Sequence, residues 1–416
     1  MDLSGKTIGV WGYGIGGSAL VNFLLKKNCE LVVFDQKPFS LEDQNFLQQR
    51  EIKVAPSLET FFEWSDKIFP SAGIDLRPYS YCSHKFLAEL DLFHYFFKKP
   101  IVAITGTLGK TTVTSYLAGF LRLAGKKVAV GGNIGVGLCS LIDDQDGVDC
   151  AVLEVSSFQL DLCKTFAPTI AVWTNFFPNH LDRHDTLEDY FFAKTRIVSL
   201  QNDSDISIVP ISIMEKVKKA SLHSHTWVAI PEVLPERWVS FIPKQGVLEN
   251  WLTICSVLTQ LEVPLEVIQR PLDVGLKHRV EYVATVSGRS FYNDSKSTVS
   301  GATLSALKQF EMPVVLMLGG LSKGVSRQDL IMQLSGKVKF VIAFGKEREQ
   351  LADWCELYGV SCCISADINE AVELAYNRSA VGDVVLLSPA GSSFDLFKNY
   401  QERGDCFKRL VFQLKG

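Results

Sequence analysis

The sequence lacks the marks of several protein classes. None of its ten cysteines forms a C-x-x-C pair, so neither a zinc ribbon nor a thioredoxin motif is indicated. No apolar stretch reaches the roughly 18 residues that a transmembrane helix needs. The formal net charge of −4 shows no basic excess of the kind that nucleic-acid binders carry. The first apolar run, Thr7–Trp11, leads straight into glycines and predicts a strand rather than a signal peptide.

These absences favour a particular cellular compartment and exclude two classes of partner. Scattered cysteines in a chain of this length are typical of small buried side chains in a reducing compartment. We therefore expect a cytoplasmic protein with no nucleic-acid partner and no membrane partner. Any anionic ligand has to be held by local groups rather than by a broad basic surface.

What the chain does contain is the alternation of strands and helices. Its 416 residues, 47% hydrophobic and 21% charged, suit two or three ordinary globular domains. Short apolar strands alternate with helical spacing, which predicts α/β units with parallel sheets. We expect domains at residues 1–96, 97–275 and 276–416, with ligands in the clefts at the strand ends. Residues 201–248 are hard to interpret, and residues 394–408 predict a helix.

The strongest local signal is T-G-T-L-G-K-T-T at Thr105–Thr112, directly after the apolar strand Ile101–Thr105. The backbone N–H groups of such a loop and of the helix that follows can bind phosphates. Lys110 would reach the β- and γ-phosphates, and the Thr111 hydroxyl would bind Mg²⁺. Ile104 stands where the pattern G-x-x-x-x-G-K-[ST] has glycine, so only the G-K-T core is present. The strand–loop–helix context favours a phosphate site over a chance turn.

A second glycine-rich turn follows the first strand. Gly12–Gly17 fits G-x-G-x-x-G, and Asp35 ends the next strand. The pattern is typical of a dinucleotide site with the carboxylate on a ribose hydroxyl. Three interpretations stay open: an NAD site, a turn that holds the diphosphate of another nucleotide, and a purely structural crossover.

Charged residues mark further strand ends. Glu154 follows an apolar strand in the unit of the Gly-Lys-Thr loop, which makes it a candidate Mg²⁺ carboxylate. His180 and Lys194 could lie near it, although a surface histidine and a solvated lysine are the ordinary alternatives. In the last unit, three apolar strands end in small and charged residues, where α/β domains place ligand contacts. These strand ends are Tyr292–Thr298, Leu318–Gly324 and Leu387–Asp395.

Taken together, these motifs resemble the Mur ligase family across the whole chain. The family order is followed by T-G-T-x-G-K-T-T, G-N-I-G, E-x-S-S-F-Q-L, N-H-L-D-R-H, H-R-V-E, N-D-S-K-x-T and L-S-P-A-x-x-S-x-D. The S-S-F-Q-L and N-D-S-K-x-T stretches and the final F-K-N-Y-x-x-R-G are similar to the members that add D-glutamate. The resemblance implies three α/β domains: a Rossmann-like N-terminal domain for the UDP substrate, a central P-loop ATPase domain, and a C-terminal domain for the amino acid.

The resemblance also implies a reaction. ATP would phosphorylate the carboxylate of UDP-N-acetylmuramoyl-L-alanine, and the amine of D-glutamate would attack the acyl phosphate, giving ADP and phosphate in peptidoglycan synthesis. The implied cofactors are ATP and Mg²⁺ at two sites, one of them through a carbamylated Lys194, and the implied form is a monomer. Alternatives are another Mur or folylpolyglutamate-type amide ligase, an NAD-dependent oxidoreductase, and a nucleotide-binding module without activity.

Carried over motif by motif, the resemblance assigns a role to each site residue. Catalytic roles fall to Lys110, His180 and Lys194. Metal binding falls to Thr111, Glu154, His180 and Lys194. ATP contacts fall to Gly106, Thr107, Gly109, Lys110, Thr111, Thr112, Asn250, Arg279 and Asp294. Contacts to the UDP substrate fall to Gly14, Ile15, Gly16, Gly17, Asp35, Gln36, Ser71, Gly73 and Asn133. D-Glutamate contacts fall to Lys296, Thr298, Lys323, Ser393 and Tyr400.

Two further points concern Lys323 and three positions that depart from the family pattern. Lys323 is the candidate for pairing with the side-chain carboxylate of the amino acid. Leu108, Thr253 and Val299 each stand where the family has asparagine. These departures weaken the expected base contacts and leave the phosphate and metal positions intact.

Overall fold

Three β-sheets organise the chain, and one falls in each of the three segments that the sequence predicts as domains. The computed structural model describes residues 2–223, 225–243, 247–272, 274–322 and 324–414. None of the helices in this described part combines the length and apolar character needed to cross a membrane.

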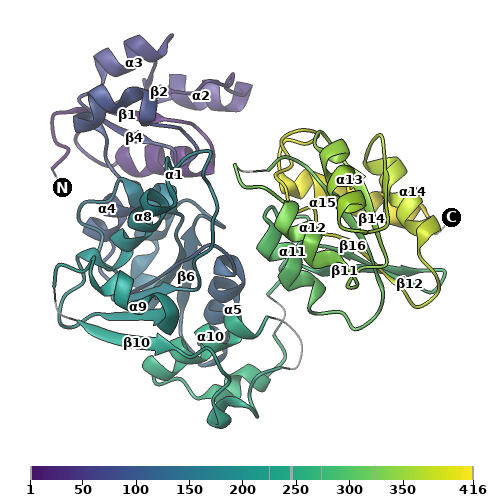
Figure 1. Cartoon of the computed structure of the whole chain (residues 1–416). Helices are drawn as coiled ribbons and strands as arrows, with labels where there is room; N and C mark the ends of the chain where they lie inside the picture. The colour runs from purple at the N-terminus through teal and green to yellow at the C-terminus, as the bar shows by residue number, and fades with distance from the viewer. Residues whose placement is uncertain (1, 224, 244–246, 273, 323, 415–416) are drawn as a thin grey trace. The chain divides into compact units, whose positions relative to one another are not determined.

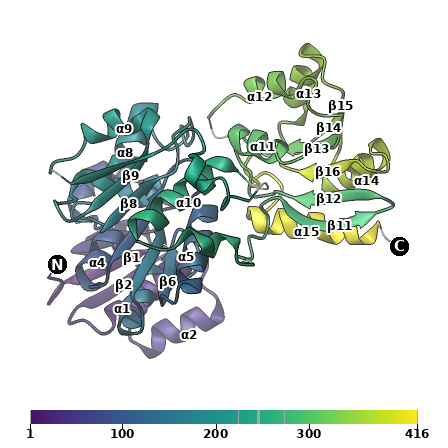
Figure 2. The ribbon, with the colours of Figure 1, turned by 90° about the horizontal axis from the view of Figure 1, so that it is seen from below.

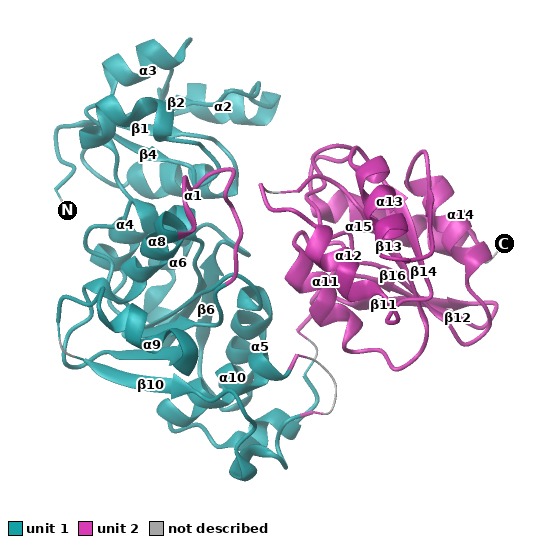
Figure 3. Cartoon of the chain, in the orientation of Figure 1, with its two compact units in different colours: residues 1–176, 188–242, 248–272 teal, residues 177–187, 243–247, 273–416 magenta. Residues whose placement is uncertain are grey.

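The chain divides into two units, which Figure 3 colours separately. Unit 1 comprises residues 1–176, 188–242 and 248–272, and unit 2 comprises residues 177–187, 243–247 and 273–416. The α/β fold class is confirmed. Two of the three sheets belong to unit 1, and the domain boundaries at 96/97 and 275/276 stay a prediction.

The first sheet is four-stranded and parallel, with the order β3-β2-β1-β4. Its strands are β1 (Thr7–Trp11), β2 (Glu30–Phe34), β3 (Lys53–Val54) and β4 (Lys67–Pro70). The helices of this segment are α1 (Ile15–Leu24), α2 (Leu41–Gln49), α3 (Leu58–Trp64), the 3₁₀ helix η1 (Arg77–Lys85) and α4 (Glu89–Phe96). Because β2 and β4 flank β1 on opposite sides, the strand order reverses at β1, where such sheets bind ligands.

The second sheet has six parallel strands in the order β10-β9-β8-β5-β7-β6. The strands are β5 (Ile101–Thr105), β6 (Val128–Gly132), β7 (Cys150–Glu154), β8 (Ile170–Trp173), β9 (Ile206–Pro210) and β10 (Thr226–Ile230). The helices are α5 (Lys110–Leu123), α6 (Leu138–Asp143), η2 (Gln145–Gly147), α7 (Ser157–Asp161), α8 (Leu187–Ser199), α9 (Ile211–Lys218), η3 (Glu236–Trp238), α10 (Leu248–Gln260) and η4 (Leu265–Gln269). The strand order reverses at β5, between β7 and β8.

Alternation along β5 explains why helices cover both faces of this sheet. Ile101 and Ala103 point into one apolar cluster, which also holds side chains of α6, α8 and α9. Val102 and Ile104 point into another, built largely from α5 and α10. Figures 1 and 2 show α5 and α10 side by side against the sheet. A strand buried on both faces is continuously apolar, which is the pattern that its sequence shows.

The third sheet lies in unit 2, with the order β11-β12-β16-β13-β14-β15; β11 is antiparallel to β12 and the other pairs are parallel. The strands are β11 (Glu281–Val286), β12 (Arg289–Asn293), β13 (Val314–Gly319), β14 (Phe340–Phe344), β15 (Cys362–Ile364) and β16 (Val384–Leu387). The helices are α11 (Ser300–Leu307), α12 (Gln328–Leu334), α13 (Arg348–Leu357), α14 (Ile368–Arg378) and α15 (Tyr400–Gln413). Clusters on the two faces contain α11–α13 and α14–α15, respectively.

One helix expectation is wrong at its start. The helix predicted over residues 394–408 begins only at Tyr400. The side chain of Asn399 accepts a hydrogen bond from the amide of Glu402 and so caps the first turn. Apolar spacing extended the helix too far upstream because it ignores this local capping bond.

Candidate active site

The Gly-Lys-Thr loop joins the end of β5 to α5, at the reversal of the second sheet. Gly109 is the N-cap of α5 with φ 79°, and a Cβ built on it would lie 2.1 Å from Asn250 Oδ1. Any side chain at this position would therefore be strained and would clash. The residues that follow β8 hold the loop: the Leu108 amide donates to Asn175 Oδ1 at 2.8 Å, and the Thr174 hydroxyl donates to the Leu108 carbonyl at 2.6 Å.

Thr111, Glu154 and Asn133 meet beside this loop. The Thr111 hydroxyl donates to Glu154 Oε2 at 2.6 Å, and Asn133 Nδ2 donates to Glu154 Oε1 at 2.8 Å. Glu154 is only 2% exposed. Oxygens this close can ligate one Mg²⁺, whose metal–oxygen distances are about 2.0–2.1 Å. A carboxylate and a hydroxyl are hard ligands, so Thr111 and Glu154 fit the predicted metal.

Two lysines converge on one carbonyl of the loop. Lys110 Nζ donates to the carbonyls of Gly106 and Thr107 at 2.9 and 3.0 Å, and Lys194 Nζ donates to the Gly106 carbonyl at 2.9 Å. Lys194 comes from α8 and is 1% exposed, so the alternative of a solvated lysine is wrong. Burial first, and then the charge of Lys110, hold the pKa of the Lys194 ammonium well below its usual value, while Glu154 opposes the shift.

His180 lies in unit 2, whereas Thr111, Glu154 and Lys194 lie in unit 1. His180 has φ 59°, and its carbonyl accepts hydrogen bonds from the amides of Arg183 and His184. The structure therefore places three of the four predicted metal ligands in one unit, and the part of His180 stays a prediction.

The glycine turn after β1 is tied to Asp35 at the end of β2. The two carboxylate oxygens of Asp35 accept hydrogen bonds from the amides of Tyr13 and Lys37 at 2.7 and 2.8 Å. A Cβ on Gly17 would lie 2.0 Å from the Gly12 carbonyl oxygen, so only glycine lets α1 pack this close. Ser71 follows β4, and its amide donates to the Trp11 carbonyl.

The other residues predicted to bind the UDP substrate divide between this region and the second sheet. Gly14 is the N-cap of α1, Ile15 and Gln36 are exposed, and a Cβ on Gly14 or Gly73 would meet no atom within 4 Å. A Cβ on Gly16 would approach Glu89 at 3.8 Å. Asn133 lies instead beside Glu154. Unit 1 thus gathers most of these residues at the reversal of the first sheet.

In unit 2, Asp294 follows β12 and is 3% exposed. Its oxygens accept hydrogen bonds from the Ser388 hydroxyl at 2.7 Å and the Val280 amide at 3.2 Å. Burial raises the pKa of Asp294 to about 6, against the opposing hydrogen bonds and the charge of Arg279. The two predicted ATP contacts of this unit, Arg279 and Asp294, are thus electrostatic neighbours.

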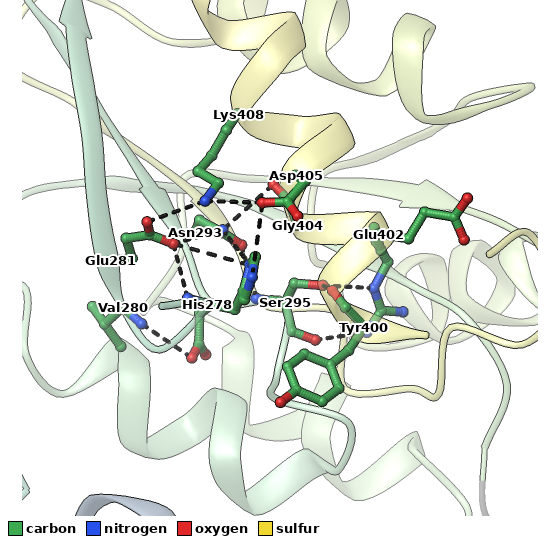
Figure 4. A network of polar contacts seen from close by, with 12 residues as sticks. His278, Val280, Glu281, Asn293, Ser295, Tyr400, Glu402, Gly404, Asp405 and Lys408 are labelled. Atoms are coloured by element: carbon green, nitrogen blue, oxygen red, sulfur yellow. Dashed lines mark hydrogen bonds and ion pairs between the residues drawn. The ribbon is translucent and has the colours of Figure 1, made fainter. Parts of the chain in front are cut away.

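A polar network around His278 fixes this region, as Figure 4 shows. Asn293 Nδ2 donates to His278 Nδ1 at 2.9 Å and to Glu281 Oε2 at 3.0 Å, and the His278 amide donates to Glu281 Oε2 at 2.8 Å. Lys408 of α15 pairs with Glu281 at 3.3 Å and with Asp405 at 3.0 Å. Because Asn293 donates to Nδ1, these partners assign the His278 proton to Nε2. The network fixes the loop that carries Asp294 and Lys296.

The predicted D-glutamate residues lie at the same edge of the third sheet. Lys296 Nζ lies 5.3 Å from the centre of the Tyr400 ring. The hydroxyl of Ser295 donates to the Tyr400 carbonyl at 2.8 Å. Ser393, which follows β16, is 2% exposed, and Thr298 follows the Asp294 loop. Lys323 lies outside the described residues.

Sequence reasoning missed two buried arginines at this edge. Arg403 lies on α15 at 0% exposure, and Arg327 precedes α12 at 2% exposure. Arg403 is part of the F-K-N-Y-x-x-R-G stretch, so a charged residue inside a recognised motif was the available signal. Nothing in the local sequence marks Arg327.

Comparisons with known proteins agree with the motifs. The family model for the Mur ligase middle domain matches residues 104–229, and the model for the Mur ligase, glutamate ligase domain matches residues 278–391. A UDP-N-acetylmuramoylalanine–D-glutamate ligase of Thermoanaerobacter sp. (strain X514) is 32% identical over 100% of both chains. The ligase of the same name from Desulfotalea psychrophila is 35% identical over 98% of this chain and 96% of its own.

Solved structures share the fold at low identity. MurF ligase from Thermotoga maritima in complex with ADP has a TM-score of 0.61 at 17% identity, covering 99% of this chain and 96% of that one. A bifunctional folylpolyglutamate synthase/dihydrofolate synthase with Mn, AMPPNP and L-glutamate bound has a TM-score of 0.55 at 16% identity, covering 82% and 99%. This likeness shows the fold alone, and it agrees with a three-domain α/β architecture.

Proposed function

This chain belongs to the Mur ligase family, and we propose that it joins D-glutamate to UDP-N-acetylmuramoyl-L-alanine with hydrolysis of ATP, in peptidoglycan synthesis. The observation that carries the ATP-dependent step is the gathering of Lys110, Thr111, Glu154 and Lys194 around one loop. The choice of D-glutamate is supported by relatives of that name, which align with the whole chain.

The chemistry follows from the poor reactivity of a carboxylate. Its oxygen attacks the γ-phosphorus of ATP, ADP leaves, and the acyl phosphate has a leaving group that the carboxylate lacked. The amine of D-glutamate then attacks the carbonyl carbon, phosphate leaves, and the nitrogen loses a proton. Lys110 would neutralise the charge that gathers on the transferred phosphoryl group. The other residues predicted to contact ATP are Gly106, Thr107, Gly109, Thr111, Thr112, Asn250, Arg279 and Asp294.

Mg²⁺ would be held at two sites. Thr111 and Glu154 offer hard oxygen ligands for one, and His180 with a carbamylated Lys194 would support the other. Bound Mg²⁺ supplies charge neutralisation to the phosphates. Carbamylation needs a neutral amine, because only its lone pair adds to CO₂, giving an N-carboxylate and one proton. Burial and Lys110 lower the pKa of Lys194, which favours that amine.

The glycine turn of the first sheet would bind UDP rather than NAD, through Gly14–Gly17, Asp35, Gln36, Ser71 and Gly73, with Asn133 beside the substrate. D-Glutamate would be bound by Lys296, Thr298, Lys323, Ser393 and Tyr400. The proposal includes three domains at residues 1–96, 97–275 and 276–416, and a cytoplasmic monomer.

The test is phosphate release from ATP with purified protein. UDP-N-acetylmuramoyl-L-alanine is supplied with D-glutamate, L-glutamate, L-lysine or D-alanine, and a folate acceptor is supplied with L-glutamate. We expect turnover only with the UDP substrate and D-glutamate together, and none in Lys110→Ala, which should still bind the UDP substrate. Preference for another amino acid or for the folate acceptor would replace the proposed function by that of another amide ligase.

A further inference from the structure

Arg403 is a buried cation that forms no ion pair with the described residues. The side chain is 0% exposed, and no carboxylate oxygen of the described residues lies within 4.0 Å of its guanidinium nitrogens. Nε donates to the Ser295 hydroxyl at 3.0 Å, and Nη2 donates to the carbonyls of Ser295 and Gly391 at 2.8 and 3.0 Å. Nη1 is buried and has no hydrogen-bond partner in the described part of the chain.

A neighbouring arginine shows the contrast. Arg327 is also buried and also donates to strand-end carbonyls, those of Gly319 and Gly320, at 2.9 and 3.2 Å. Its charge, however, is matched by Glu347 at 2.6 Å. The two guanidiniums lie close to the same loop, because a Cβ on Gly320 would be 3.0 Å from Arg403 Nη1. Among the described residues, one of the two buried guanidiniums therefore contacts a carboxylate directly and the other does not.

An unpaired buried cation is costly, so proteins rarely keep one without a partner. Burial lowers the pKa of Arg403 to about 10, which leaves the guanidinium charged at neutral pH. The carbonyl partners satisfy donors but do not neutralise the charge. Two carboxylates act on Arg403 without forming an ion pair with it: Asp395, which is half-buried and accepts a hydrogen bond from the Lys346 amide, and the buried Asp294; the charge of Arg327 opposes them. This edge of the third sheet consequently favours an anion.

We infer that Arg403 is a positioning residue that sets specificity for the side-chain carboxylate of the amino-acid substrate. The positive charge of Arg403 attracts this carboxylate through space, and its hydrogen bonds hold the loops that carry Lys296 and Ser393. Arg403 contacts Ser295 through two bonds, and Ser295 directly precedes Lys296. The Ser295 hydroxyl also donates to the Tyr400 carbonyl (Figure 4). Gly391 lies two residues before Ser393. Because Arg403 is fully buried, it acts through the field and these loops and does not touch the substrate. The inference rests on the proposed function.

The first test separates the amino-acid site from the ATP site. Arg403→Gln removes the charge and keeps hydrogen-bonding groups, and Arg403→Lys keeps the charge. We expect Arg403→Gln to raise the KM for D-glutamate about tenfold or more, with the KM for ATP changed less than about twofold. Arg403→Lys should recover most of this loss. The matched control is Arg289→Gln, at the start of β12, where the arginine also donates to carbonyls, those of Ser379 and Ser287; it should behave as the wild type.

A second readout isolates the charge. D-Glutamine has the shape of D-glutamate without the side-chain carboxylate, and it is measured as a substrate or as a competitive inhibitor. The preference for D-glutamate should fall about tenfold in Arg403→Gln and should persist in Arg403→Lys. Thermal unfolding of each variant reports whether it is folded. If Arg403→Gln does not fold, Arg403→Lys alone decides, and a tenfold loss of preference in it overturns the inference.

The possible failures are distinguishable. Wild-type protein without D-glutamate-dependent turnover would reject the proposed function. Normal wild-type turnover, with Arg403→Gln and Arg403→Lys equally impaired for D-glutamate, ATP and D-glutamine, would assign Arg403 a structural role only. An unchanged KM for D-glutamate in folded Arg403→Gln would likewise overturn the inference.

Discussion

The Thr111 hydroxyl donates a 2.6 Å hydrogen bond to Glu154, which joins the first turn of α5 to the end of β7. β5, whose loop leads into α5, and β7, which ends at Glu154, are parallel neighbours, so both residues lie at the same edge of the sheet. Asn133 occupies the second carboxylate oxygen at 2.8 Å. The carboxylate is therefore oriented by the fold itself.

Glu154→Gln should reduce ATP turnover by roughly 100-fold and shift the Mg²⁺ dependence to higher concentration, because a charged oxygen ligand is lost at almost unchanged shape. Phosphate release over a Mg²⁺ titration measures both effects. Glu188→Gln is the matched control, since Glu188 is an exposed partner of Lys216 and should leave the titration unchanged. A wild-type Mg²⁺ response in Glu154→Gln would remove Glu154 from the metal site.

Lys194→Ala should be nearly inactive, and formate or acetate should partly restore turnover by filling the place of the carbamate. Wild-type activity should also fall in CO₂-depleted buffer and return with bicarbonate. The exposed Lys53, paired with Glu30, provides the control variant Lys53→Ala, which should need no rescue. Full activity of Lys194→Ala in CO₂-depleted buffer would leave the carbamate without a role.

Asp35→Asn should weaken binding of the UDP substrate about tenfold without changing the KM for ATP. The substitution removes a charge and leaves only one oxygen for the amides of Tyr13 and Lys37. Calorimetry with UDP and with NADH checks both the effect and the ligand class. Tight NADH binding with no response to UDP would contradict the UDP assignment and favour a dinucleotide site at this turn.

Glu89 predicts a pH dependence of stability in unit 1. Burial raises its pKa from 4.5 to about 7, against hydrogen bonds with Cys139 in the first turn of α6. Part of the side chain reaches the surface, but Oε1 is buried and lacks a hydrogen-bond partner within the described residues. A raised carboxyl pKa gives stability that is fully present below pH 4.5 and is lost as the pH rises through 7.

Glu89→Gln should therefore be more stable than the wild type at pH 8 by roughly 1–3 kcal/mol, and the difference should vanish near pH 4.5. Denaturant unfolding at pH 4.5, 6 and 8 measures it. A difference independent of pH would mean that the Glu89 carboxyl does not titrate in this range.

Local sequence determined much of the fold. β1 and β5 have the bounds that their apolar runs predicted, because a glycine, Gly12 or Gly106, directly follows each of them and ends the strand. Residues 201–248 resisted interpretation, and they contain β9, α9 and β10. Part of β10 is only half-buried, so its apolar pattern is weak.

The sequence by itself also determined the glycine turns, the Gly-Lys-Thr loop and the candidate residues at the strand ends, since each is a short motif next to one strand. Tertiary structure alone decided which of them meet. The bond between Thr111 and Glu154 spans 43 positions in sequence, and it exists because β5 and β7 become neighbours while β6 lies outside them. The burial of Lys194 and of Arg403 likewise depends on distant elements that cover them. Periodicity reports the environment of one element, whereas a pKa or the burial of a charge depends on every element packed against the residue.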